Sequence, residues 1–230
     1  MDSPDKRKLL NKALKGFIIL NLVLAAAFFI PAYTINYINA WVFIIIFSGF
    51  VLFNSIYFFK KDEKLLERRL HGGPAVEKEK SQKIIQVCIR VLFPSMMITC
   101  GLDKHFMLSN VPLFLSIISF LLIIVGFAIV FFVFKENTFT SSSITVHENQ
   151  NVISTGPYAV VRHPMYSGAA ILCLCAPIAL GSYYALIFGF MMILVYISRL
   201  LNEEKYLTKN LAGYREYVEK VKYRLIPHIW

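Results

Sequence analysis

Long apolar segments alternate with short charged ones along this chain. A transmembrane helix needs roughly 20 mostly apolar residues. Four segments meet that need: 16–33, 40–59, 84–101 and 112–134. A fifth apolar stretch, 169–200, is interrupted at Gly181-Ser182, which predicts two helices joined as a tight hairpin. The pattern therefore predicts an all-α polytopic membrane protein with five to six transmembrane helices, the last two forming that hairpin.

The composition agrees with this interpretation. The chain has 230 residues, of which 57% are hydrophobic and 15% aromatic. It is too apolar for an ordinary soluble domain and too short for several domains. Residues 1–230 are therefore predicted to form a single integral membrane domain.

The distribution of charge predicts the orientation. The net charge is +10, and the basic residues cluster in segments 6–15, 60–83 and 205–224, beside the predicted spans. Lys104 is the only Lys or Arg in the connections that fall on the other side. The positive-inside rule accounts for this asymmetry and predicts a multi-pass protein of the cell membrane with both termini cytoplasmic. The basic charge is therefore no sign of a nucleic-acid partner.

Two polar segments of the cytoplasmic side have helical patterns. Residues 61–70 form a short amphipathic helix, whose expected role is to connect spans and touch anionic headgroups rather than to act in catalysis. Residues 203–222 are predicted to form an amphipathic helix folded back on the bundle. Pro227 is expected to stop that helix, and Trp230 to anchor at the interface.

Two polar clusters flank the apolar hairpin. Residues 156–168 read GPYAVVRHPMYSG, and charge or fixed backbone shape at the mouth of a membrane bundle is costly unless it has a function. About forty residues later, Arg199 and Glu203 are one helical turn apart and share a face. The two clusters predict one site, although Arg199 and Glu203 also suit a helix-end ion pair, and Arg162 suits a headgroup anchor.

The sequence gives no sign of a metal site. Its four cysteines lie in or at the ends of apolar segments, and none has a metal-binding or redox spacing. Its histidines are scattered without the spacing of a zinc site. We therefore predict no metal and no structural disulfide.

The run GPYxxxRHPxYxG, followed by RxxxEExxL and then by YREYVEKVKYRLIP, resembles the isoprenylcysteine carboxyl methyltransferase family and its bacterial membrane relatives, within the broader group that contains phospholipid methyltransferases. The resemblance covers residues 135–230. It implies that S-adenosylmethionine binds in a cytoplasmic pocket and that a lipophilic acceptor enters from the bilayer. Residues 1–134 would then supply transmembrane helices, and residues 135–230 the cofactor-binding and catalytic region.

The resemblance also implies roles for individual residues. It assigns the acceptor end, and hence catalysis, to Arg199 and Glu203. It assigns cofactor contacts to Gln150, Asn151, Val152, Ile153, Tyr158, His163, Pro164, Met165 and Tyr166. The polar segment 135–155, which precedes the first cluster, would then be a wall of the cofactor pocket rather than a solvated loop.

The chemistry of these residues agrees with that assignment. The aromatic faces of Tyr158 and Tyr166 can stabilise a sulfonium cation, and Arg162 and His163 can donate to a carboxylate. A carboxylate acceptor needs no general base, so Arg199 would hold it while Glu203 orients Arg199 or accepts from an amide of the acceptor. An amine or thiol acceptor must lose a proton, and Glu203 or Glu204 would then be the base.

The predicted function is S-adenosylmethionine-dependent methyl transfer to a lipophilic small molecule or lipid, with carboxyl O-methylation of an isoprenylcysteine-like substrate as the leading reaction. Phospholipid N-methylation and thiol S-methylation are alternatives. A sterol-type NADPH reductase is a third, although the sequence has no Gly-rich pyrophosphate turn. A non-enzymatic transporter or scaffold is a fourth, against which stands the lack of paired repeats.

Overall fold

The fold is entirely helical in the part of the chain that the structure describes. The structure is a computed structural model, and it describes residues 4–70, 77, 79–140, 146 and 150–230. These residues contain no β-strand. They form α1 (Pro4–Ala32), α2 (Ile38–Lys61), α3 (Glu63–Leu70), α4 (Lys80–Phe106), α5 (Leu113–Glu136), the 3-10 helix η1 (Gly156–Ala159), α6 (Pro164–Ala179), α7 (Leu186–Asn210) and α8 (Tyr214–Lys220). The predicted all-α class is confirmed.

Five helices are long and apolar enough to cross a membrane: α1, α2, α4, α5 and α7. The sixth apolar helix, α6, has only 16 residues. At 1.5 Å per residue it is about 24 Å long, short of the roughly 30 Å of a hydrocarbon core. The prediction of five to six spans ending in a hairpin is confirmed, and the chain is an integral membrane protein.

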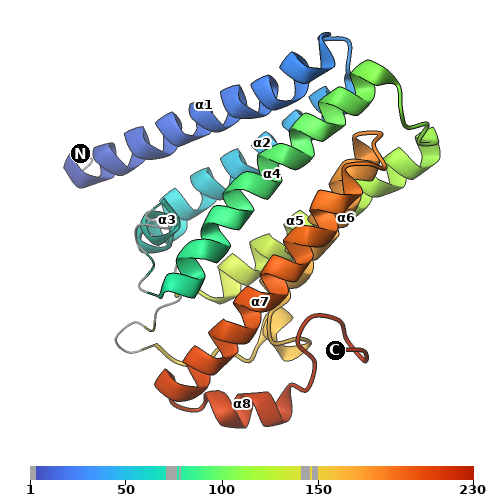
Figure 1. Cartoon of the computed structure of the whole chain (residues 1–230). Coiled ribbons are helices and arrows are strands. Elements are labelled where there is room, and N and C mark those ends of the chain that lie inside the picture. Colours follow the sequence, from blue (N-terminus) through green and yellow to red (C-terminus); the bar gives the residue numbers. More distant parts are fainter. Residues whose placement is uncertain (1–3, 71–76, 78, 141–145, 147–149) are drawn as a thin grey trace.

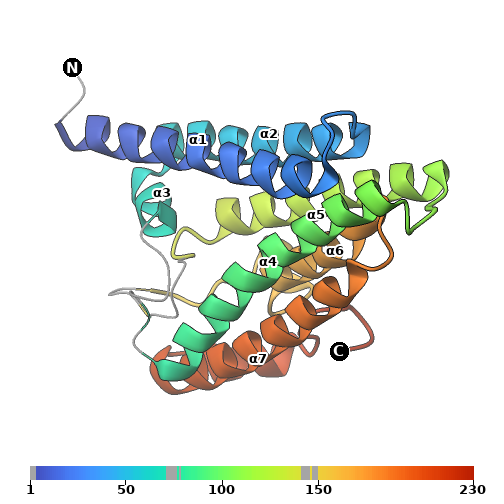
Figure 2. The same cartoon turned by 45° about the horizontal axis from the view of Figure 1, so that its top comes forward.

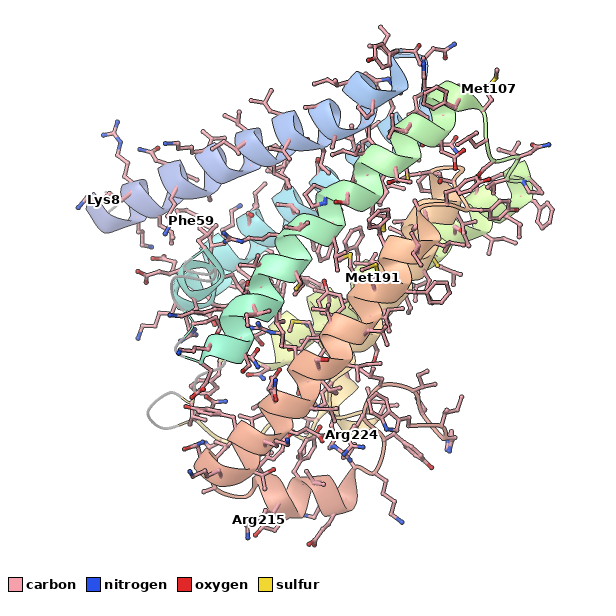
Figure 3. The ribbon with its side chains drawn as sticks, viewed as in Figure 1. Lys8, Phe59, Met107, Met191, Arg215 and Arg224 are labelled. Atoms are coloured by element: carbon pink, nitrogen blue, oxygen red, sulfur yellow. The ribbon has the colours of Figure 1, made fainter. Side chains whose placement is uncertain are left out.

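The helices form a bundle with two distinct ends. α1 and α2 lie side by side as one layer, and α4 crosses between that layer and α7 (Figures 1 and 2). Lys8, Phe59 and Arg215 mark one end of the bundle and Met107 marks the other (Figure 3). We call the first the polar end, because α3, η1 and α8 all lie there.

Several helix pairs approach closely through glycine. A Cβ atom on Gly101 of α4 would lie 2.6 Å from the carbonyl oxygen of Phe28 in α1. A Cβ atom on Gly168 of α6 would lie 2.8 Å from the carbonyl oxygen of Gly126 in α5, and one on Gly189 of α7 would meet the carbonyl of Cys173 in α6. Small residues let membrane helices pack closely where lipid supplies no hydrophobic driving force.

One predicted helix is wrong. Residues 203–222 are divided between the last two turns of α7 and the separate helix α8, because Gly213 has φ +80° and the chain turns there. Glu203 is therefore part of a long membrane helix. The amphipathic helix predicted over 61–70 is confirmed as α3, with Leu65 and Leu66 buried.

The C-terminal tail is also different from the prediction. Helix α8 ends at Lys220, seven residues before Pro227, so the proline does not stop it. The carbonyl oxygen of Trp230 accepts hydrogen bonds from the backbone N–H groups of Leu225 and Ile226. The Trp230 ring packs in a cluster that contains Tyr166, which ties the end of the chain to the site described below.

The glycine contacts predict the effect of adding one methyl group. We expect Gly189→Ala to destabilise the protein by about 1–3 kcal/mol, because the new Cβ overlaps the backbone of α6. Gly49→Ala in α2 is the matched control, since a Cβ there meets nothing within 4 Å. Thermal unfolding of both variants in detergent checks this. Equal melting temperatures for the two variants would contradict the close packing of α6 against α7.

Candidate functional site

A cavity of ≈ 580 Å³ runs from the polar end into the bundle. Its size is typical of small-molecule sites. All eleven residues that the sequence singled out line it: Gln150, Asn151, Val152, Ile153, Tyr158, His163, Pro164, Met165, Tyr166, Arg199 and Glu203. The fold therefore brings the two polar clusters to one place.

The cavity has two kinds of wall. At the polar end its lining comes from segment 150–153, from η1 and from α8, and we call this part the polar compartment. Inside the bundle its lining is aromatic and sulfur-containing, and we call this part the apolar compartment. The apolar lining includes Phe43, Phe47, Phe93, Met96, Phe127 and Met192. One cavity thus joins a polar site to an apolar one.

The loop that begins the first cluster has a defined local shape. Thr155 is extended, Gly156 has φ +56°, and Pro157 lies in the first turn of η1. Its neighbour in the cavity wall is segment 135–155, of which Asn137, Thr140 and residues 150–153 line the cavity. The described part of that segment is therefore a wall of the cavity, while residues 141–145 and 147–149 lie outside the described residues.

Tyr158 is fixed at both of its polar groups. Its hydroxyl oxygen accepts from the Asn137 amide at 3.1 Å, and its carbonyl oxygen accepts from the Tyr217 hydroxyl at 2.8 Å. Burial raises the pKa of Tyr158 to about 12. The ring therefore stays neutral near neutral pH and offers an aromatic face to the cavity.

The Glu204 carboxylate gathers three basic side chains at the base of the polar compartment. Arg162 Nε donates to Oε1 at 2.6 Å, and Arg224 Nε donates to Oε2 at 2.8 Å. His163 Nε2 lies 3.3 Å from Oε1. Both Glu204 oxygens accept from guanidinium donors, and Glu204 is not in the described lining of the cavity. Its alternative role as a general base stays a prediction.

Arg162 is structural as well. It is 5% exposed, and its Nη1 donates to the carbonyl oxygens of Val221 and Lys222 at 2.8 and 2.9 Å. The backbone N–H groups of Arg162 and His163 donate to the tail carbonyls of residues 223 and 224, both at 2.9 Å. The prediction of Arg162 as a headgroup anchor is wrong. These hydrogen bonds instead hold the C-terminal tail against the loop ahead of α6. Arg224 lies where the tail passes α7 (Figure 3).

We call the part of the cavity wall formed by Arg69, Tyr166, Arg199 and Glu203 the waist. It contains the second predicted cluster, Arg199 and Glu203. The hydroxyl of Tyr166 on α6 donates to Glu203 Oε2 on α7 at 2.7 Å. Arg199 Nη2 donates to Glu77 Oε1 at 2.9 Å. This guanidinium nitrogen contacts the Glu77 carboxylate, and Arg199 also lies within electrostatic reach of Glu203. Orientation of Arg199 by Glu203 stays a prediction.

Two charged residues in or beside this waist, Arg69 and Glu77, were not predicted from the sequence. Arg69 of α3 lines the cavity with its guanidinium 4.6 Å from the ring centre of Phe134. Burial, together with the nearby charge of Arg199, lowers the pKa of Arg69 to about 10, so it remains a cation. Arg69 lies four residues after the buried Leu65, so the helical pattern could have placed it on the face of α3 that packs against the bundle. Glu77, in the connection between α3 and α4, had no local signal.

No metal centre is visible in the residues that the structure describes: they contain no group of three His, Cys, Asp or Glu side chains that could hold an ion. The four cysteines are free thiols. Cys173 lies in the wall of the apolar compartment.

Residues 114–213 match the family model for phospholipid methyltransferases. The match supports a membrane methyltransferase. It covers somewhat less than half of the chain, from α5 to the turn before α8, and it contains both polar clusters. No curated protein matches the chain.

The Glu204 cluster predicts a large loss of stability on truncation. We expect Glu204→Ala to cost about 3–5 kcal/mol, because it leaves the buried Arg162 without its carboxylate. Glu204→Gln should cost less, since an amide oxygen can still accept from one guanidinium. Exposed Glu219 of α8 provides the matched control, Glu219→Ala. Thermal unfolding in detergent measures the difference, and similar melting temperatures for Glu204→Ala and Glu219→Ala would refute it.

Proposed function

We propose that the protein transfers a methyl group from S-adenosylmethionine to a lipophilic acceptor that reaches the site from the bilayer. The observation that carries the proposal is the single cavity that joins the polar compartment to the apolar one. The family match over residues 114–213 supports the same activity. The reductase and scaffold alternatives gain no comparable support.

The residues of the polar compartment fit the cofactor by their chemistry. The neutral, buried ring of Tyr158 is suited to a sulfonium cation. His163 and the polar segment Gln150–Asn151 offer hydrogen-bonding groups for a carboxylate and an adenine. Val152, Ile153, Pro164 and Met165 supply apolar surface. The basic residues near this end favour its placement on the cytoplasmic side.

The acceptor would reach the cofactor at the waist. When bound, S-adenosylmethionine supplies an electrophilic methyl carbon, whose bond to sulfur breaks as a bond to the acceptor atom forms, with the electron pair staying on sulfur. The protein's task is then to orient the acceptor and exclude water, and orientation alone can be worth roughly 7–11 kcal/mol. Arg199 is suited to hold an acceptor carboxylate through two parallel N–H donors. The apolar compartment, built mainly by helices of residues 1–134, is suited to its hydrocarbon part.

The leading reaction we propose is carboxyl O-methylation of an isoprenylcysteine-like acid. This reaction needs no general base, because a carboxylate acceptor carries no proton to remove. Phospholipid N-methylation is the second candidate, and it has an observation of its own. Arg69 and Arg199 are both cations at the waist and are suited to a phosphate, while Glu203 remains as a possible base for an amine.

Cofactor binding is the first test of this function. We expect saturable calorimetric binding of S-adenosylmethionine and S-adenosylhomocysteine to the detergent-purified protein, and at least tenfold weaker binding by His163→Ala. The matched control is His105→Ala, because His105 is exposed at the opposite end of the bundle. A folded wild-type protein that binds neither compound would overturn the proposal.

Acceptor chemistry is the second test. We expect turnover of N-acetyl-S-farnesyl-cysteine, and a fall of about 100-fold in kcat for Arg199→Ala at unchanged cofactor affinity, since lost alignment can cost that much. A carboxylate acceptor is already ionised at neutral pH, so the rate with this acceptor should not increase when the pH is raised further. With dioleoylphosphatidylethanolamine as acceptor the rate should rise with pH as the amine loses its proton. If only the amine is methylated, and its rate increases with pH, phospholipid N-methylation becomes the favoured reaction in place of carboxyl methylation.

A further inference from the structure

We propose that Glu77, which lies between α3 and α4, is the positioning residue for Arg199 and thereby a working part of the acceptor site. The inference rests on the proposed function, because it takes Arg199 as the group that holds the acceptor. It assigns a role to a residue of segment 60–83, which the sequence predicted only to connect spans and touch anionic headgroups.

The Glu77 carboxylate is buried and joins two helices. Glu77 is 3% exposed. Its Oε1 accepts from Arg199 Nη2 on α7 at 2.9 Å and from Gln86 Nε2 on α4 at 3.0 Å. A buried carboxylate is costly unless it is paired and hydrogen-bonded. Its place between α4 and α7 therefore depends on these contacts.

Glu77 contacts Arg199 without lining the cavity itself. The described lining of the cavity includes Arg199 and Gln86 but not Glu77. A guanidinium carries five N–H donors in one rigid plane. A hydrogen bond from one of its nitrogens to Glu77 therefore restricts the directions in which the plane can face the cavity. Glu77 supports Arg199 in this way without occupying the acceptor's space.

The contact also sets the charge that an acceptor meets. Arg199 lies at the waist with Arg69, and each guanidinium is within electrostatic reach of the other. Glu77 offsets one of these two positive charges. An anionic acceptor is then held by directed hydrogen bonds more than by a net positive field, which favours alignment over tight ground-state binding.

Kinetics with N-acetyl-S-farnesyl-cysteine separate positioning from a merely structural role. We expect Glu77→Ala to lower kcat 10- to 100-fold while the Kd for S-adenosylhomocysteine changes less than twofold. Glu77→Gln keeps an accepting oxygen but removes the charge, so kcat should fall less than fivefold and KM for this anionic acceptor should fall. Glu79→Ala is the matched control, because Glu79 is exposed in the same segment.

Two outcomes of that experiment overturn the proposal. One is wild-type kcat and KM in a folded Glu77→Ala variant. The other is a loss of cofactor affinity that parallels the loss of kcat, which would indicate general damage to the fold.

A second measurement does not depend on activity. Melting temperatures of Glu77→Ala, Arg199→Ala and the double variant form a double-mutant cycle. We expect the double variant to lose no more than the worse single variant, because either change already breaks the pair. Additive losses would overturn the pairing. If the wild-type protein methylates no acceptor, the proposed function fails, and the cycle still decides whether Glu77 holds Arg199.

Discussion

A partly buried carboxylate, Glu204, organises the polar end of this bundle through its basic partners. Glu204 accepts from Arg162 and Arg224 and lies beside His163, and so it joins α7, the loop ahead of α6 and the C-terminal tail. The charges can stay buried because each is paired and hydrogen-bonded, and loss of one partner would expose the others to the full cost of desolvation. The same tail also reaches the cavity wall, since its residue Leu225 packs with Tyr166, which lines the cavity.

The elements that the sequence predicted well are those governed by local pattern. Apolar runs of about 20 residues located the membrane helices to within a few residues at most ends, although α1 begins twelve residues before the predicted span, because a helix continues through its charged flanks. The same effect explains the error over residues 203–222, where α7 extends ten residues beyond the apolar stretch and the break comes only at Gly213. The hydrophobic pattern predicts where a helix leaves the lipid, whereas the helix itself ends only where the backbone conformation changes.

The site shows which contacts could not be predicted from the sequence. The eleven predicted residues line one cavity. Those at the start of α6 and on α7 meet because the two helices form a hairpin, and the others come from segment 150–153 and η1, directly ahead of α6. Glu77 and Arg69 were missed because their places depend on contacts with distant helices, Glu77 with Arg199 on α7 and Arg69 with Phe134 on α5. Such tertiary contacts leave no periodicity in the sequence. The sequence identified Arg162 as a candidate but did not predict its partners, because the tail carbonyls to which it donates lie about 60 residues away along the chain.

One turn of α7 serves both halves of the cavity. Adjacent residues of an α-helix point about 100° apart, so Glu203 faces Tyr166 at the waist while Glu204 faces Arg162 below the polar compartment. Arg199, one turn earlier, faces the connection that carries Glu77. A shift or rotation of α7 would therefore move the residues proposed to contact the acceptor together with those below the polar compartment. The proposed in-line transfer requires acceptor and cofactor to keep a fixed relation. Placing these residues on adjacent turns of one helix, held by the ion pairs Arg199–Glu77 and Glu204–Arg162, is a direct way to maintain it.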